Sequence, residues 1–426
     1  MNCFQNALTL MLLFAWTVLP AQKKLMDRAN DYYREERFAE AIPMYEEALK
    51  TTRNLSAENK LAFCYRMNNR MDSAEAVYAR VVVQEKAPAK SFFYYAEALM
   101  SNGKYEQARQ WFDDYTKLEP DDEQGQAMIR ACEVARHLQP YFPAPEVQPF
   151  PFNSAADDSA PVHWQGGLVF SSDRNQGLKL LKQKSGWTGR DFLQLYVCAI
   201  TDDSLGYAEP QPFSTRLNEL NKNTSNASFT ADGRQVFFTR NSNASDRQDY
   251  INLQLFSAET DSLTGAGTRA NWRHVERLPF CNPEHNYMHP AIAADGKRLV
   301  FVSDKPNGEG QTDLYISERT EKGWSTPINL GAGINTAGAE GFPFWHPDGR
   351  LFFCSRGLPG MGGFDLFVTW QDSDGLWVPP LNLGPPVNSP QDDLAIFLEA
   401  DGQSGWFTSS RSGGDDDIYV FRIKGQ

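Results

Sequence analysis

The chain contains two kinds of internal repeat with different periods, and these constrain its fold more than any other feature. From residue 23 to residue 138, apolar residues recur at the spacing of amphipathic helices. From residue 147 onward, short β-branched and aromatic runs alternate with turn residues such as Asp-Gly. The repeats predict an α + β multidomain chain in which an all-α solenoid precedes an all-β domain.

The helical repeat occurs in three copies, which align at intervals of 33 and 34 residues. Small residues recur where the two helices of a hairpin would touch, and aromatic residues recur where one hairpin would meet the next. The aligned residues are Ala29, Tyr32, Ala41, Tyr45 and Ala48; Ala62, Tyr65, Ala74, Tyr78 and Val81; and Ala96, Leu99, Ala108, Phe112 and Tyr115. This pattern resembles the tetratricopeptide repeat (TPR). The resemblance implies stacked hairpins over residues 23–138, with a capping helix over 123–138.

Stacked TPR hairpins leave a concave groove lined by the first helix of each repeat, and the resemblance implies that a peptide or partner helix binds there. The register places eight residues in this groove: Asn30, Tyr33, Asn59, Phe63, Arg66, Phe93, Glu97 and Met100. The alternative is that these are ordinary half-exposed residues and that the array is only a spacer. The sequence leaves both open.

Three prolines within residues 139–146 end the helical pattern and predict a short, stiff linker. Five copies of a strand unit follow over residues 147–426. Each has an entry strand, a turn and an apolar strand, and four of the five turns contain Asp-Gly. Tandem four-stranded units predict the blades of a β-propeller.

The fifth copy lacks its fourth strand, and residues 147–152 are the candidate to supply it from the other end of the domain. Such pairing would close the ring without leaving an open sheet edge. This favours five blades. A six-bladed ring is the alternative, with the extra blade hidden in residues 241–250 or 261–273.

The copies resemble the WD40-like (PD40) repeat of TolB-type propellers. The likeness is clearest in residues 303–315, 355–367 and 409–419, where a Ser-Asp or Ser-Arg pair, a glycine loop and an Asp-Leu or Asp-Ile pair follow one another. We expect the Asp that opens each third strand to accept hydrogen bonds within its loop, which is a structural role.

The combination of both repeats looks like that of Bacteroidota envelope proteins, some of them linked to type IX secretion and gliding. Those proteins also carry a carboxypeptidase-regulatory-like domain and an OmpA-like domain. We expect neither here, and so no direct OmpA-like grip on peptidoglycan.

Residues 1–21 contain no charged side chain and carry an apolar run that ends at Leu19-Pro-Ala. This is typical of a secretory signal peptide and is too short to span a membrane. It predicts export to the periplasm or the inner face of the outer membrane, with an uncleaved anchor or a mis-assigned start as alternatives. The net charge of −13 argues against nucleic acid as a partner.

The motifs that would indicate chemistry are incomplete, so we expect no enzymatic activity, metal or cofactor. Residues 402–406 lack the final glycine of a nucleophile elbow. His285 and His289 have a zinc-like spacing, but Pro283 and Pro290 disfavour the helix that this spacing needs. Residues 415–417 are three aspartates without the spacing of a calcium loop, and bound calcium stays open.

The sequence therefore favours a non-enzymatic scaffold that binds envelope or outer-membrane proteins. A module that senses cell-wall glycan is the competing interpretation. Its candidate stacking residues are Trp164, Trp345 and Trp406.

Overall fold

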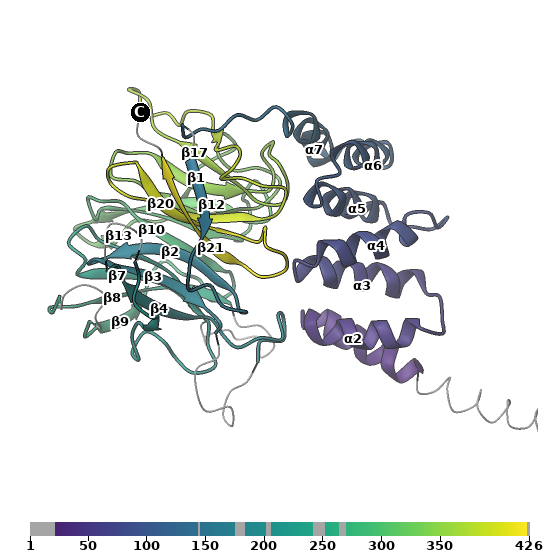
Figure 1. The fold of residues 1–426 in the computed structure, drawn as a ribbon, viewed down its shortest axis with the longest axis horizontal. Helices are drawn as coiled ribbons and strands as arrows, with labels where there is room; N and C mark the ends of the chain where they lie inside the picture. The colour runs from purple at the N-terminus through teal and green to yellow at the C-terminus, as the bar shows by residue number, and fades with distance from the viewer. Residues whose placement is uncertain are drawn as a thin grey trace, which may run out of the picture.

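The computed structural model describes residues 22–143, 145–174, 184–201, 206–241, 252–263 and 270–423. A helical array lies beside a five-bladed β-propeller (Figure 1). The array begins with a helix described over residues 22–34 and continues with α2 (Phe38–Leu49), α3 (Leu55–Met67), α4 (Met71–Val81), α5 (Ala89–Ser101), α6 (Tyr105–Leu118) and α7 (Glu123–Val134).

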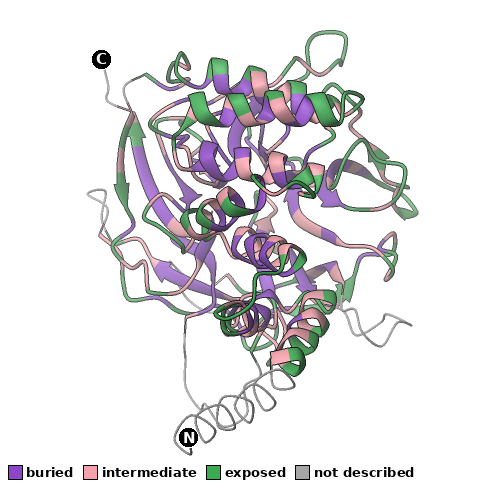
Figure 2. Ribbon diagram, turned by 90° about the vertical axis from the view of Figure 1, so that its right-hand side faces the viewer, coloured by how far each residue is buried: buried purple, intermediate pink, exposed green. Residues whose placement is uncertain are grey.

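The predicted repeat positions form the core of the array. Each of the paired alanines is fully buried, which lets neighbouring helices approach closely. The turn inside each hairpin has one residue in the left-handed region: Glu36, Asn69 and Gly103. Figure 2 views the molecule from the side of the array and shows the buried residues along the strands and on the inward sides of the helices.

The propeller sheets each contain one complete copy of the predicted strand unit. The first sheet holds β2 (Asp158–Trp164), β3 (Gly167–Ser172), β4 (Gln194–Ala199) and β5 (Gln211–Pro212), and the second holds β6 (Thr224–Phe229), β7 (Gln235–Asn241), β8 (Leu253–Glu259) and β9 (Arg273–Arg277). The third holds β10 (Tyr287–Ile292), β11 (Arg298–Ser303), β12 (Asp313–Thr320), β13 (Gly323–Trp324) and β14 (Ile328–Asn329). The fourth holds β15 (Glu340–Trp345), β16 (Leu351–Ser355), β17 (Asp365–Thr369) and β18 (Leu381–Asn382).

The last sheet confirms the predicted closure of the ring. It contains β19 (Asp393–Leu398), β20 (Ser404–Ser409) and β21 (Asp417–Ile423), and its outer strand is β1 (Pro145–Pro149) from the beginning of the domain. Val147 pairs with Phe421 in an antiparallel register. The propeller has five blades, because the described parts of residues 241–250 and 261–273 extend blade two rather than form a sixth.

Each entry strand has a bulge, which the sequence did not predict, and in four of the five strands the bulge connects neighbouring blades. Four of the bulge residues have positive φ although none is glycine, and their backbone N–H groups point at the preceding blade. Ala160, Asn226 and His289 donate to the hydroxyls of Thr408, Ser171 and Thr239, respectively. These bonds satisfy buried donors and fix the rotation between blades.

The fourth blade uses a different acceptor for the same purpose. Val302 occupies the position that holds Ser or Thr in the other three cases, so it offers no oxygen. Instead the Phe342 N–H donates to Nδ1 of His289 at 3.2 Å, and the two rings stack with centroids 3.8 Å apart. His289 therefore belongs to a blade junction.

The aspartate that opens the third strand has the structural role that we expected. Asp313 accepts hydrogen bonds from the N–H groups of Glu309 and Gly310, and Asp365 accepts them from Met361 and Gly362. Each carboxylate thus holds its glycine loop closed.

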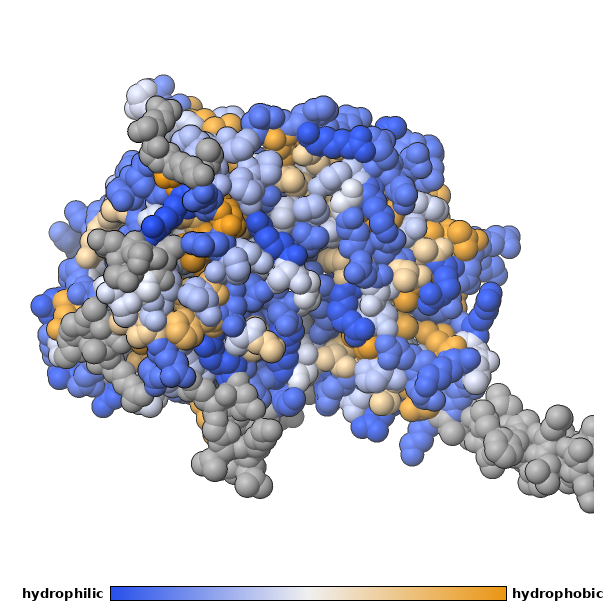
Figure 3. Space-filling view, in the orientation of Figure 1, coloured by the Kyte–Doolittle hydropathy of each residue, from blue (hydrophilic) through white to orange (hydrophobic). Residues whose placement is uncertain are grey.

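The face of the molecule drawn in Figure 3 has no single large apolar patch. Hydrophilic residues cover most of the face shown in Figure 3, and hydrophobic residues gather in separate small patches. No helix in the described ranges combines the length and the apolar character that crossing a bilayer would need.

Candidate functional site: the groove of the array and the propeller loops

The predicted groove begins with a polar contact between the first two repeats. Asn30 Oδ1 accepts hydrogen bonds from the Lys60 ammonium at 2.6 Å and from the Tyr45 hydroxyl at 3.0 Å. Between the second and third repeats, Asn59 Oδ1 accepts from the Ser91 hydroxyl at 2.8 Å. Both predicted asparagines therefore tie adjacent hairpins together.

A row of three half-buried aromatic rings crosses the three repeats. Tyr33 and Phe63 meet edge to face with centroids 5.8 Å apart, and Phe63 and Tyr94 meet at 5.7 Å. Burial raises the pKa of the Tyr33 phenol. Since each ring keeps part of its surface exposed, the row forms an apolar strip that a partner could cover.

The row ends at an ion pair that joins the second and third repeats. An Arg66 nitrogen lies 2.7 Å from a Glu97 oxygen, and only 9% of each side chain is exposed. The guanidinium also lies over the Tyr94 ring, 4.5 Å from its centroid. Removing either partner would leave a buried unpaired charge, so loss of one partner should destabilise the contact between the second and third repeats.

Three of the eight predicted groove residues are buried: Glu97, which is 7% exposed in its ion pair, and two residues of the hydrophobic core of the array. Phe93 is 2% exposed and contacts the rings of Phe112 and Tyr115. Met100 is 1% exposed, with its sulfur 3.9 Å from the Cys132 sulfur of α7. The capping helix and α6 cover Phe93 and Met100, so the prediction that Phe93, Glu97 and Met100 line an accessible groove is wrong.

The propeller contacts the array at the turns inside the hairpins. Trp187, from the connection between β3 and β4, donates its indole N–H to the carbonyl of Met67, the last residue of α3. Its ring meets Phe38 edge to face at 4.8 Å, and its carbonyl accepts the N–H of Ala39 in the first turn of α2. One propeller residue thus satisfies free backbone groups at the ends of two helices.

A second contact repeats this arrangement one hairpin further along. Gln391 donates its side-chain N–H to the carbonyl of Ser101, the last residue of α5, at 3.2 Å. Ser101 and Met67 occupy equivalent positions, 34 residues apart. Two propeller loops therefore contact equivalent helix ends in successive repeats of the array.

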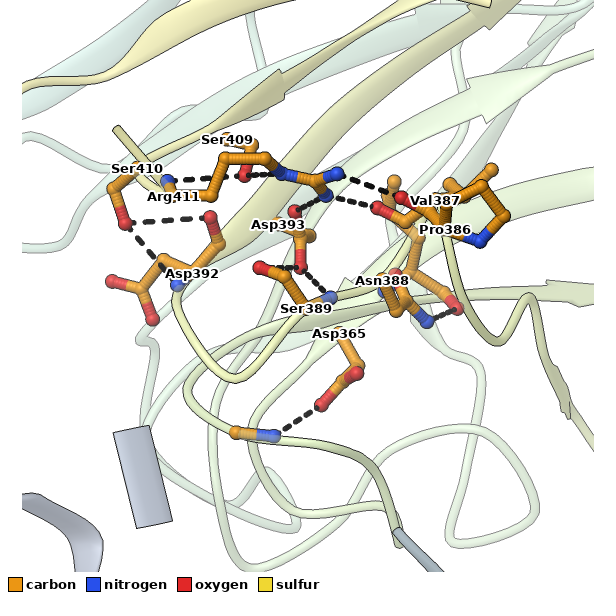
Figure 4. A network of polar contacts seen from close by, with 12 residues as sticks. Asp365, Pro386, Val387, Asn388, Ser389, Asp392, Asp393, Ser409, Ser410 and Arg411 are labelled. Atoms are coloured by element: carbon orange, nitrogen blue, oxygen red, sulfur yellow. Dashed lines mark hydrogen bonds and ion pairs between the residues drawn. The ribbon is translucent and has the colours of Figure 1, made fainter. Parts of the chain in front are cut away.

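The residues on both sides of Gln391 are anchored by polar contacts, and Figure 4 shows those of Ser389, Asp392 and Asp393. The preceding Ser389 hydroxyl donates to Asp393, and Arg411 reaches the other oxygen of that carboxylate at 2.6 Å. Asp392 accepts the N–H of Phe364 from the neighbouring blade at 2.8 Å. Since residues on both sides of Gln391 are anchored, its side chain is presented in a fixed position.

Two buried polar atoms near this contact make no hydrogen bond within the described part of the chain. They are Oδ1 of Asp365 and the hydroxyl of Tyr105, the first residue of α6. Burial raises the pKa of Asp365 to about 8. Burial, followed by the charge of Asp365, raises the pKa of Tyr105 to about 12.

The linker is also part of this junction. Tyr141 donates its backbone N–H to Leu383 at 2.9 Å, and Phe142 is buried against Phe421 of the last blade. The predicted linker, residues 139–146, therefore runs along the propeller, and its last two residues already belong to β1.

Sequence reasoning missed Trp187 and Gln391 because both lie in loops that belong to neither repeat. One signal was present: the connection between the second and third strands of the first blade is much longer than its counterpart in the fourth.

The described residues contain no group of three or more side chains suited to hold a metal ion. His285 lies in a turn and His289 in β10, so they share no helix. Asp415 forms an ion pair with Arg190.

The tryptophans suggested for glycan stacking serve the blade packing instead. Trp164, Trp345 and Trp406 are at most 6% exposed. The Trp164 and Trp406 indoles donate to the Gly233 carbonyl and the Tyr207 hydroxyl. That assignment of glycan-stacking residues is wrong.

Comparison with known proteins identifies the array. The tetratricopeptide repeat model matches residues 26–91 and 84–123. No curated protein matches the chain.

Solved structures similar to the chain include propellers with and without catalytic activity in their names. TolB from Acinetobacter baumannii is 13% identical (65% of this chain, 57% of that chain, TM-score 0.36). Trypanosoma rangeli sialidase in complex with the inhibitor DANA is 11% identical (67% and 60%, TM-score 0.37). A glycoside hydrolase is 9% identical (70% and 95%, TM-score 0.45). The chain thus spans less than two thirds of the first two, and likeness at this level carries no conclusion about activity. The chain is a tetratricopeptide-repeat array joined to a five-bladed β-propeller, an architecture suited to protein–protein interaction.

Proposed function

We propose that this chain is an exported, non-enzymatic scaffold whose TPR groove binds a protein partner while the propeller holds the array in a fixed orientation. The observation that carries the proposal is the half-exposed row of Tyr33, Phe63 and Tyr94, set beside helix ends that the propeller fixes. Partly exposed aromatic residues on a rigid surface are the usual anchors of protein interfaces.

The place and partners of the scaffold belong to the same proposal. The signal-peptide-like residues 1–21, which lie outside the described residues, support export to the periplasm or the inner face of the outer membrane. The resemblance to Bacteroidota envelope proteins supports envelope or outer-membrane proteins as partners, in a type IX secretion or gliding complex.

An affinity pull-down from the detergent-solubilised envelope of the native host tests the proposal. Envelope proteins recovered with the tagged wild type should be lost with Tyr33→Ala and Phe63→Ala. The control Leu118→Ala changes an apolar side chain that is 51% exposed on α6, and should retain them. Equal recovery by all variants, with melting temperatures unchanged, would exclude the groove. Recovery of the protein from the cytosol alone would exclude the location.

A further inference from the structure

The tunnel of the propeller opens into a pocket on the side away from the array. The pocket has a volume of about 240 Å³ and is lined by all five entry strands and the turns that follow them. The array contacts loops that precede or connect strands at the opposite end, such as Gln391 before β19. A ligand in this pocket would therefore not compete with a partner in the TPR groove.

Several aromatic residues contribute to the wall of the pocket. Six line it: Trp164, Phe229, Phe342, Phe344, Trp345 and Phe397. The four phenylalanines are only half-buried, and the rings of Phe344 and Phe397 lie 4.8 Å apart. Exposed aromatic faces carry partial negative charge, which attracts cations.

The formal charge of the wall has one sign. Among the described residues that line the pocket there is no Lys or Arg, and the one Asp or Glu is Glu399. Phe397 and Glu399 are two residues apart along a strand and its extension, so their side chains fall on the same face. The carboxylate and the ring thus border the same space.

His163 lies beside the carboxylate of Glu399. The Gly166 N–H donates to Nε2 of His163 at 3.2 Å, so the proton of this imidazole lies on Nδ1. Nδ1 lies 2.9 Å from Oε1 of Glu399, and 26% of the glutamate side chain is exposed. One carboxylate oxygen therefore faces the imidazole, while the side chain keeps part of its surface open to the pocket.

We propose that this pocket binds a compact organic cation, an ammonium or guanidinium group on an apolar stem, with Glu399 as counter-charge and the adjoining rings of Phe344 and Phe397 on one side of it. The volume lies below the roughly 300 to 1,000 Å³ of drug-sized ligand sites, which favours one side chain or a small molecule. A lysine or arginine of a protein and a free quaternary ammonium share this chemistry.

Calorimetric titration of the mature protein, residues 22–426, with three probes tests the proposal and separates the two sources. The probes are choline, Nα-acetyl-lysine methylamide and the uncharged norleucine analogue of the latter. At least one cation should bind with a Kd on the order of 1 mM or below. The norleucine analogue should bind roughly tenfold more weakly than the lysine probe, because it lacks the charge. Binding of choline alone indicates a small ammonium ligand, and binding of the lysine probe alone indicates a partner side chain.

Two variants connect binding to the residues. Glu399→Gln keeps an oxygen for His163 and removes the charge, so cation affinity should fall roughly tenfold. Phe397→Leu keeps apolar volume and removes the ring, and should weaken binding by several-fold. Glu318→Gln, an exposed glutamate of β12 outside the pocket, is the matched control and should bind like the wild type. The proposal fails if no probe binds at about 10 mM, if the lysine probe binds and norleucine matches it, or if Glu399→Gln and Glu318→Gln behave alike.

Discussion

Asp365 is a buried carboxylate whose ionisation should oppose folding. Burial raises its pKa to about 8 in the folded protein, and burial likewise raises the pKa of Glu340 and of Asp173 to about 7. Unfolded carboxyl groups ionise near pH 4. Between these values the folded state binds more protons at these three groups, so their contribution to stability is largest at low pH and is lost as pH rises toward 8.

Asp365→Asn should reduce that pH dependence. The new side chain keeps an oxygen for the Met361 and Gly362 N–H groups and places an amide where Oδ1 has no partner. Chemical denaturation at pH 5.5 and 8.5 should show the free energy of unfolding falling less in the variant, by about 1 to 3 kcal/mol. Asp313→Asn changes the equivalent residue of blade three and is the control. An unchanged difference between the two pH values in Asp365→Asn would contradict the assignment.

His289 should matter for stability through one hydrogen bond. His289→Ala removes the acceptor of the buried Phe342 N–H, and the free energy of unfolding should fall by about 1 to 3 kcal/mol. Burial lowers the pKa of His289 to about 3, whereas an unfolded histidine ionises near pH 6.5, so the wild type loses stability between pH 8 and pH 6 that the variant keeps, and the loss caused by the substitution should be smaller at pH 6 than at pH 8. Denaturant titration at both values checks this.

Val302→Thr supplies the hydroxyl that the other junctions use, and it provides the rescue experiment. When Val302→Thr is added to His289→Ala, it should restore part of the lost stability. In the wild type, where His289 already accepts the bond, the same substitution should not increase stability. Identical effects in the two backgrounds would show that the junction does not depend on this bond.

At the scale of elements, the loop that carries Trp187 should couple the array to the propeller. Trp187→Ala removes the bond to the Met67 carbonyl and the contact with Phe38. Hydrogen exchange followed by mass spectrometry should show faster exchange at the end of α3 and the start of α2. Gln391→Ala should likewise speed exchange at the end of α5. The control Gln403→Ala, in an exposed turn, should leave exchange unchanged in all three of these helices. Unchanged exchange in both helices would mean that other contacts fix the array.

The elements themselves were largely predictable, and their mutual contacts were not. Alanine and aromatic spacing gave the hairpins, and Asp-Gly turns between apolar runs gave the blades, because local patterns determine both. Phe93 and Met100 were misplaced because the register alone does not show what α7 covers. Trp187 was missed because its loop makes long-range contacts that leave no periodic signal. Of the groove, the residues that link repeats could be predicted, and the propeller's contribution could not.

At the scale of the whole molecule, closure of the ring depends on the five residues of β1, which are far in sequence from the strand they pair with. β1 pairs with β21 across the junction between the first and last parts of the domain. Two truncations isolate its contribution. A chain that begins at residue 139 keeps the buried Phe142 and β1, whereas a chain that begins at residue 151 loses both.

The chain that begins at residue 139 should fold as a monomer with a cooperative thermal transition, since the array lies outside the ring. The chain that begins at residue 151 leaves β21 as an unpaired edge and exposes Phe421, so it should melt at lower temperature and aggregate. Size-exclusion chromatography and calorimetry distinguish the two. Equal melting temperatures would show that blade packing alone holds the ring, whereas failure of both would show that the array is needed to fold the propeller.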